Sequence, residues 1–225
     1  MKDRIIIALD TQDKNELNTL LDNLNEATYF KVGMEAFYTF GVDLLKELKK
    51  REKKIFLDLK LHDIPNTVAK SLKSLCQHDI DMINIHATGG MEMMKKARSI
   101  VPHHIKLIAV TALTSHSQRD LKNDFGINTE LPKIVDTLAA LTKDAGVDGV
   151  VCSAHEVGNI KELCGNDFIT VTPGIRLAGD DQQDQKRVMT PKDAFKAGSD
   201  YLVMGRSITQ AQNPNETFIK MLGEL

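Results

Sequence analysis

The stretch that decides the fold is Ile55-Phe56-Leu57-Asp58-Leu59-Lys60-Leu61-His62-Asp63-Ile64-Pro65-Asn66-Thr67-Val68. Its first half alternates as a β-strand does, because every second residue from Ile55 is aliphatic and the residues between them are Phe56, Asp58 and Lys60. Pro65 suits the first turn of a following helix. The sequence therefore predicts a buried strand that ends in charged side chains and leads directly into a helix.

Three charges of opposite sign interrupt this otherwise apolar segment, at Asp58, Lys60 and Asp63. Charged side chains are costly to bury unless they pair with one another. Two interpretations are open at this point: a structural ion pair at the end of a strand, or a catalytic group of charges.

Strand and helix patterns alternate along the whole chain. The predicted strands cover 4–10, 29–33, 55–60, 82–86, 106–110, 149–152, 168–171 and 201–204. The predicted helices cover 12–25, 35–51, 65–78, 91–100, 131–145, 156–163, 191–197 and a last segment to the C-terminus. Thr11 is expected to cap the first of them, and a long polar loop is expected before residue 131. This alternation predicts an α/β fold, a (β/α)8 TIM barrel formed by residues 1–225 as a single domain.

Composition restricts the possible partners. The chain has 225 residues, 42% hydrophobic and 27% charged, with a net charge of -2, which argues against binding to nucleic acid or to an acidic membrane. No apolar run approaches the length of a membrane span, and residues 1–10 do not resemble a signal peptide. Cys76, Cys152 and Cys164 have no metal-binding spacing and indicate reduced thiols in a cytoplasmic protein.

Polar residues gather where the predicted strands end. They are Asp10, Lys31, Asp58, Lys60, His86, Thr111, Thr114, Arg176, Gly205 and Arg206. In a barrel of this class the carboxyl ends of the strands carry the active site. A single charge of this kind is usually a surface residue, but their joint placement favours a site. For His86 a structural hydrogen bond and a catalytic role are both open.

The loops after the seventh and eighth strands predict a phosphate site. Arg176 and Arg206 each offer a guanidinium there, and Gly205 lets the backbone approach a ligand at a helix start. The alternative is that both arginines pair with Asp180 and Asp181. Residues 177–186 lack apolar periodicity, which predicts a mobile lid.

The sequence resembles the orotidine 5'-phosphate decarboxylase family over essentially its whole length. The most specific part is the segment from Asp58 to Val68 quoted above. Support comes from Ala8-Leu9-Asp10, Phe30-Lys31-Val32-Gly33-Met34, Val110-Thr111-Ala112-Leu113-Thr114-Ser115, Val171-Thr172-Pro173-Gly174-Ile175-Arg176, Asp184-Gln185 and Val203-Met204-Gly205-Arg206-Ser207. No position at which the family places a key residue departs from its pattern.

The resemblance implies decarboxylation of orotidine 5'-monophosphate to uridine 5'-monophosphate and CO2, without a cofactor and without a metal. It implies that Lys60, Asp58 and Asp63 form the catalytic charge network. It implies that Asp10 and Lys31 bind the ribose, with Thr67 nearby, and that Thr114 contacts the pyrimidine. Arg176, Gly205 and Arg206 would bind the phosphate, and Gln185 would lie between the base and the phosphate. It also implies a homodimer in which Asp63 and Thr67 enter the neighbouring subunit's site.

Two other classes remain to be compared with this one. The superfamily shares Asp-x-Lys-x-x-Asp with magnesium-dependent sugar-phosphate decarboxylases and aldolases, which would be sensitive to a chelator. The second alternative class is a phosphate-binding barrel without catalytic activity. Such a protein would not require Lys60 between the two acids Asp58 and Asp63. The chemistry favours the decarboxylase: loss of CO2 leaves electron density at C6, which an ammonium can stabilise and protonate.

Overall fold

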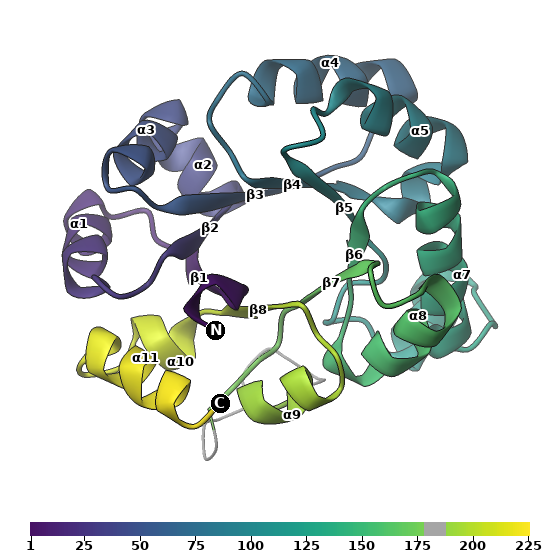
Figure 1. Cartoon of the computed structure of the whole chain (residues 1–225). Coiled ribbons are helices and arrows are strands. Elements are labelled where there is room, and N and C mark those ends of the chain that lie inside the picture. The colour runs from purple at the N-terminus through teal and green to yellow at the C-terminus, as the bar shows by residue number, and fades with distance from the viewer. Residues whose placement is uncertain (178–187) are drawn as a thin grey trace.

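The computed structural model describes residues 1–177 and 188–225, and its eight parallel strands close into a barrel in the order of the sequence. Figure 1 looks along the barrel and shows the strands as an inner ring with the helices outside it. The strands are β1 (Ile5–Leu9), β2 (Tyr29–Gly33), β3 (Lys54–Leu61), β4 (Met82–His86), β5 (Lys106–Val110), β6 (Gly149–Val151), β7 (Ile169–Thr172) and β8 (Tyr201–Met204). The predicted (β/α)8 barrel is confirmed.

The helices lie around the ring and connect successive strands, with α2 and α3 both between β2 and β3, α6 and α7 both between β5 and β6, and α10 and α11 after β8. They are α1 (Lys14–Asn23), α2 (Met34–Phe40), α3 (Val42–Lys50), α4 (Pro65–Leu75), α5 (Gly90–Ile100), α6 (Gln118–Phe125), α7 (Leu131–Asp144), α8 (Val157–Cys164), α9 (Pro191–Lys196), α10 (Arg206–Thr209) and α11 (Pro214–Gly223). Short 3-10 helices occur at η1 (Lys2–Arg4), η2 (Ala87–Gly89) and η3 (Ala154–Glu156). None of the helices in the described residues is long and apolar enough to cross a bilayer.

The core has two layers, because successive side chains of a strand point to opposite faces. One layer fills the inside of the barrel and contains Ile6, Ala8, Tyr29, Phe56, Met82, Ile108, Val171 and Val203. The other layer lies between the strands and the helices, where Ile5, Ile7 and Leu9 of β1 pack with Leu17 and Leu21 of α1. Polar side chains that share the inner face are therefore held in a rigid apolar frame.

The prediction of one helix over 35–51 is wrong, because the chain forms α2 and α3 there instead. Gly41 separates them with φ +62°, a conformation that most residues avoid and that interrupts the helical hydrogen bonds. The apolar period continues across this glycine, and for that reason the pattern alone did not reveal the break.

Three smaller predictions also need correction. The loop predicted before residue 131 contains α6, which starts with a capping box formed by Ser117 and Asp120. Asp13, rather than Thr11, caps α1, since its carboxylate accepts hydrogen bonds from the amides of Asn15 and Glu16. The C-terminal segment predicted as a single helix contains both α10 and α11.

Candidate active site

A row of alternating charges crosses the carboxyl ends of the first three strands. Lys31 on β2 lies between two carboxylates, with its Nζ 3.1 Å from Asp10 Oδ1 and 3.4 Å from Asp58 Oδ2. Lys60 Nζ lies 2.8 Å from Asp58 Oδ1. The structure therefore joins Asp10, Lys31, Asp58 and Lys60 into one network of ion pairs.

Burial and charge act in opposite directions on the two inner members of this network. Burial alone would raise the pKa of Asp58, but the neighbouring ammonium groups of Lys31 and Lys60 outweigh it and hold that pKa below its usual value. Burial alone would lower the pKa of Lys31, and the carboxylates of Asp58 and Asp10 outweigh it and raise that pKa. Both groups are therefore charged at neutral pH despite their burial.

The strand that carries Asp58 and Lys60 is irregular between them. Leu57 pairs with Ile83 of β4 and Leu61 pairs with Ile85, so four steps along β3 are matched by two along β4. Lys60 has φ +51° in this bulge, a left-handed conformation that costs free energy for any residue except glycine. The regular alternation of side chains expected across 55–60 therefore breaks before Lys60. Lys60 and Asp58 nevertheless line the same cavity.

Asp63 and Thr67 lie apart from this network. Both side chains are exposed, Asp63 in the turn after β3 and Thr67 in the first turn of α4. The Asp63 carboxylate accepts a hydrogen bond from the amide of Ile64, at 2.6 Å. Among the ion pairs of the described residues, Lys60 has Asp58 as a partner and not Asp63.

Two cavities open at this end of the barrel, and they share the lining residues Lys31, Pro173 and Val203. The smaller one, of about 180 Å³, is lined by Asp58, Lys60 and Thr114 together with apolar residues of β3, β5 and β6. The larger one, of about 460 Å³, is lined by Asp10, Arg176, Gly205 and Arg206. Thr114 is thus placed with Asp58 and Lys60, and the two arginines are placed together in the other cavity.

The residues of the predicted phosphate site lie in the segments that follow β7 and β8. Arg176 follows β7, is 8% exposed and donates from Nη1 to the carbonyl of Ile175 at 3.1 Å. Gly205 follows β8 and precedes α10, whose first residue is Arg206. A side chain at position 205 would come within 3.7 Å only of Ala8 Cβ, so packing inside the protein does not itself demand glycine there.

Part of the predicted site falls outside the described residues. Gln185, the acidic residues Asp180 and Asp181 and most of the predicted lid at 177–186 belong to the segment between residues 177 and 188. Among the described residues, no group of three or more histidine, cysteine, aspartate or glutamate side chains is placed to hold a metal ion.

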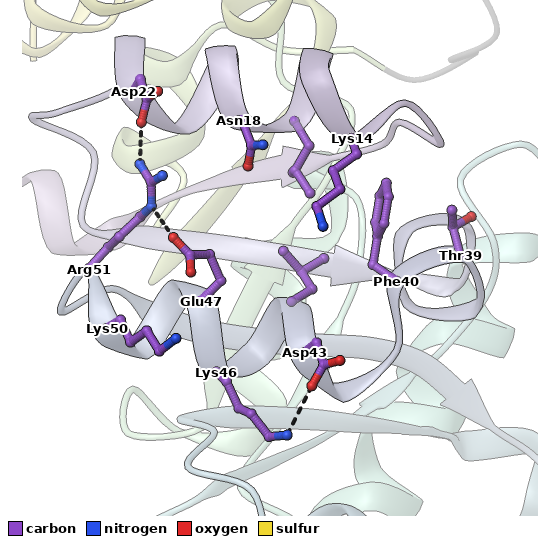
Figure 2. A pocket seen from close by; sticks show the side chains of 12 residues that line it. Lys14, Asn18, Asp22, Thr39, Phe40, Asp43, Lys46, Glu47, Lys50 and Arg51 are labelled. Carbon is purple, nitrogen blue, oxygen red and sulfur yellow. Dashed lines mark hydrogen bonds and ion pairs between the residues drawn. The ribbon is translucent and has the colours of Figure 1, made fainter.

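A larger cavity of about 770 Å³ lies outside the barrel, in the groove between α1 and α3 (Figure 2). Its charges largely satisfy one another: Arg51 pairs with Asp22 and Glu47, and Lys46 pairs with Asp43. It has none of the charge network described above. Size alone therefore does not identify the site, and the chemistry favours the end of the barrel.

His86 ends β4 and contacts other polar residues near the site. Its Nδ1 lies 2.8 Å from Thr88 Oγ1, and its ring stacks on His62 with centroids 5.2 Å apart. Burial, with smaller contributions from His62, Lys60 and His116, lowers the pKa of His86 to about 4. The geometry gives this ring a hydrogen-bonding role at the rim of the site.

One residue of the site was not predicted. Asn84 of β4 is fully buried; its Nδ2 donates to Asp58 Oδ1 at 2.6 Å, and its Oδ1 accepts from the Lys60 amide at 2.8 Å. The signal in the sequence is a single amide in the strand Met82-Ile83-Asn84-Ile85-His86, at a position that faces the inside of the barrel. Without the register of β3 and β4, that signal does not reveal its partners.

The chain matches the family model described as "Orotidine 5'-phosphate decarboxylase / HUMPS family" over residues 3–221. It is 50% identical to the orotidine 5'-phosphate decarboxylase of Bacillus cereus (strain G9842), over 97% of this chain and 95% of that protein. The corresponding protein of Bacillus mycoides (strain KBAB4) is 49% identical, with the same coverage.

Solved structures agree with these relatives. The orotidine 5'-phosphate decarboxylase of Lactobacillus acidophilus has a TM-score of 0.85 and 40% identity, and the alignment covers 98% of this chain and 97% of that one. An uncharacterized conserved protein from Geobacillus kaustophilus has a TM-score of 0.84 and 39% identity, with 98% and 99% covered. The chain therefore belongs to the orotidine 5'-phosphate decarboxylase / HUMPS family.

Proposed function

We propose that this chain decarboxylates orotidine 5'-monophosphate to uridine 5'-monophosphate and CO2, with Lys60 as the proton donor. The observation that carries the proposal is the ion-pair network of Asp10, Lys31, Asp58 and Lys60, centred on the buried Asp58, beside a cavity that Arg176 and Arg206 line. A nucleotide monophosphate has the matching parts: a charged phosphate, a sugar with hydroxyl groups and a flat base.

The two adjoining cavities suggest how the substrate lies. The phosphate would bind Arg176 and Arg206, with the Gly205 backbone beside it, since guanidinium groups match phosphate oxygens in charge and geometry. The ribose would meet Asp10 and Lys31. The pyrimidine would enter the smaller cavity, with Thr114 at its edge and C6 facing Lys60. By resemblance to the family alone, Gln185 is proposed to bridge the base and the phosphate.

The reaction breaks the bond between C6 and the carboxylate carbon, and the electron pair stays on C6 as CO2 leaves. The positive charge of Lys60 stabilises this pair, and a fixed charge in a site shielded from water does so strongly. Lys60 then transfers a proton from Nζ to C6, and its neutral amine regains a proton from water. Asp58 holds Lys60 in place at 2.8 Å. The energy of phosphate binding, far from C6, helps to fix this geometry.

Asp63 and Thr67 point to an assembly of two chains. Both are exposed after β3, and both belong to the motif that resembles the family most closely. We propose a homodimer in which they complete the partner's site. The proposal involves no nucleic acid or membrane partner, and three free cysteines agree with a cytoplasmic location.

The test is the loss of orotidine monophosphate absorbance on mixing with the purified protein, with and without EDTA. We expect turnover in both conditions and a fall of at least about 100-fold in kcat for Lys60→Ala. Lys46→Ala is the matched control, because Lys46 is an ion-paired lysine in the outer groove. Turnover that disappears with EDTA, or that survives in Lys60→Ala, would contradict the proposal.

A further inference from the structure

The bulge in β3 separates the two charged residues of that strand and leaves their backbone without regular pairing to β4. Lys60 lies in this bulge with φ +51°, and its amide has no ladder partner on the neighbouring strand between the pairs Leu57–Ile83 and Leu61–Ile85. An unpaired buried amide is unfavourable, and so is a left-handed conformation at a residue other than glycine. Some other group must stabilise this backbone.

The side chain of Asn84 fills that role with both of its polar atoms. Its Oδ1 accepts the hydrogen bond from the Lys60 amide at 2.8 Å, and its Nδ2 donates to Asp58 Oδ1 at 2.6 Å. The same Asp58 oxygen also accepts from Lys60 Nζ. Asn84 is fully buried, so water does not replace either bond. One amide thus fixes the backbone of the lysine and the carboxylate that orients its ammonium group.

We propose that Asn84 is a positioning residue for the reaction, which holds Lys60 Nζ at the reacting carbon by bonding Asp58 and the Lys60 backbone together. This inference rests on the proposed function for its chemistry, but not for its geometry. Asn84 does not line either cavity of the site, so it acts through Asp58 and Lys60 and does not contact the substrate.

Neither leucine nor aspartate at this position would supply both bonds. Leucine has a similar volume but offers neither bond, so Asp58 Oδ1 would lose a donor and the Lys60 amide would lose its acceptor. Aspartate keeps an acceptor for the Lys60 amide, but it places a second carboxylate against Asp58. A shift of about 1 Å in a reacting group can reduce a rate by roughly 100-fold.

The first measurement compares kcat with nucleotide binding for Asn84→Leu and Asn84→Asp. We expect kcat to fall by at least about tenfold in both, while the dissociation constant for uridine monophosphate stays within about threefold, because the phosphate contacts come from β7 and β8. A loss of kcat and of uridine monophosphate affinity in equal proportion would contradict the proposal, since it would indicate a general structural role.

Thr142→Val is the control for loss of a buried polar bond away from the site. Thr142 on α7 is fully buried and donates to the Leu138 carbonyl at 2.7 Å. Its variant should lose thermal stability and keep the wild-type kcat. If Asn84→Leu does not fold, Asn84→Ala makes the same comparison with a smaller side chain that also offers neither bond. Wild-type kcat in any folded Asn84 variant would overturn the proposal.

The second measurement does not depend on activity. Crystal structures of the wild type and of the folded variant should show the wild-type Lys60 with positive φ and the variant with a changed Lys60 backbone or a displaced Asp58 carboxylate. If Lys60 and Asp58 keep their places without Asn84, the positioning role is wrong. If they move but the wild type has no decarboxylase activity, the proposed function fails and the positioning geometry stands.

Discussion

At the residue scale, the site is a row of charges that alternate in sign. They lie so close together that a substitution at one residue affects the charge next to it. Asp58 touches two lysines, and Lys31 touches two aspartates. Removing Asp58 would leave Lys60 without its partner in this network, and removing any other member would take one of two partners from Asp58 or Lys31, which is unfavourable for a buried charge. The network proposed for catalysis therefore also stabilises the carboxyl end of the barrel, and mutations in it should be tested for both effects.

Gly33→Ala should impair the reaction although Gly33 carries no charge. A Cβ at this position would lie 2.8 Å from Lys31 Nζ and 3.4 Å from Asp10 Oδ1, while the backbone φ of -85° suits alanine. Lys31 is held from two sides and must lengthen an ion pair to make room. We expect kcat/KM to fall by about tenfold or more.

Gly158→Ala is the control for that experiment, because a Cβ there meets no atom within 4 Å. It lies in the first turn of α8 and should leave kcat/KM unchanged. Thermal midpoints of both variants show whether they are folded. Wild-type kcat/KM in Gly33→Ala would mean that Lys31 can shift without consequence.

His86 should make stability depend on pH in a limited range. Its pKa is lowered from 6.5 to about 4, chiefly by burial, so the unfolded chain takes up a proton first as the pH falls. Stability linked to His86 is therefore complete above about pH 6.5 and is lost toward pH 4. The ring is partly exposed, so solvent screening reduces the effect to the order of 1 kcal/mol.

Urea unfolding at several pH values would measure this dependence. His86→Asn should flatten the curve between about pH 6.5 and about pH 4 relative to wild type. His104→Asn, which replaces an exposed histidine, is the control. An unchanged slope in His86→Asn would show that other groups account for the loss of stability in acid.

Strand periodicity and the order of strands predicted that Asp10, Lys31, Asp58 and Lys60 would gather at one end of a barrel, and the structure brings these four side chains together. The sequence did not predict the role of Asn84 or the left-handed backbone of Lys60. Both depend on the register between β3 and β4, which is a property of two strands and not of either alone.

At the element scale, the ends of the strands assemble the site, and the irregular parts of the chain were the hardest to predict. The strand ends were found because a period of two is visible in short apolar runs. The break at Gly41 and the short helix α6 were missed, since a glycine within a continuing period and a polar capping box in a loop both leave the apolar pattern unchanged.

Arg206→Ala should reduce turnover through the phosphate. Arg206 begins α10 and, with Arg176, lines the cavity of about 460 Å³ at the end of the barrel. Loss of one charge-assisted contact should decrease transition-state stabilisation by roughly 1.5–3 kcal/mol, measured as kcat/KM for orotidine monophosphate. Turnover of the nucleoside, which has no phosphate, should be insensitive to the change.

Arg119→Ala, which removes an exposed arginine of α6, is the control and should affect neither substrate. An equal loss with nucleotide and nucleoside would place Arg206 at the base or in a structural role instead. Arg206→Lys should fall between wild type and Arg206→Ala, because it keeps the charge and loses the planar pair of donors.

At the scale of the whole molecule, the closed barrel brings together residues from both ends of the chain, and the turn after β3 is exposed. Asp10 and Arg206 are far apart in sequence yet line one cavity, because β8 pairs with β1. Asp63 is exposed, and the next residue, Ile64, is an apolar side chain with 68% exposure. An exposed acid of the motif beside an exposed apolar residue fits a surface that a second chain covers.

The proposed sharing of sites predicts that two inactive variants restore activity when they pair. Lys60→Ala and Asp63→Ala homodimers should each be nearly inactive. In a mixed dimer one site carries both changes, and the other receives an intact Lys60 from one chain and an intact Asp63 from its partner. Under two-fold symmetry the doubly tagged heterodimer should therefore have about half of the wild-type sites.

Co-expression under two different tags, followed by purification over both, isolates this species, and Lys60→Ala paired with itself in the same way is the control. If Asp63 serves its own chain, every site of the heterodimer carries one lesion. A purified heterodimer as inactive as its parents would then exclude the shared site.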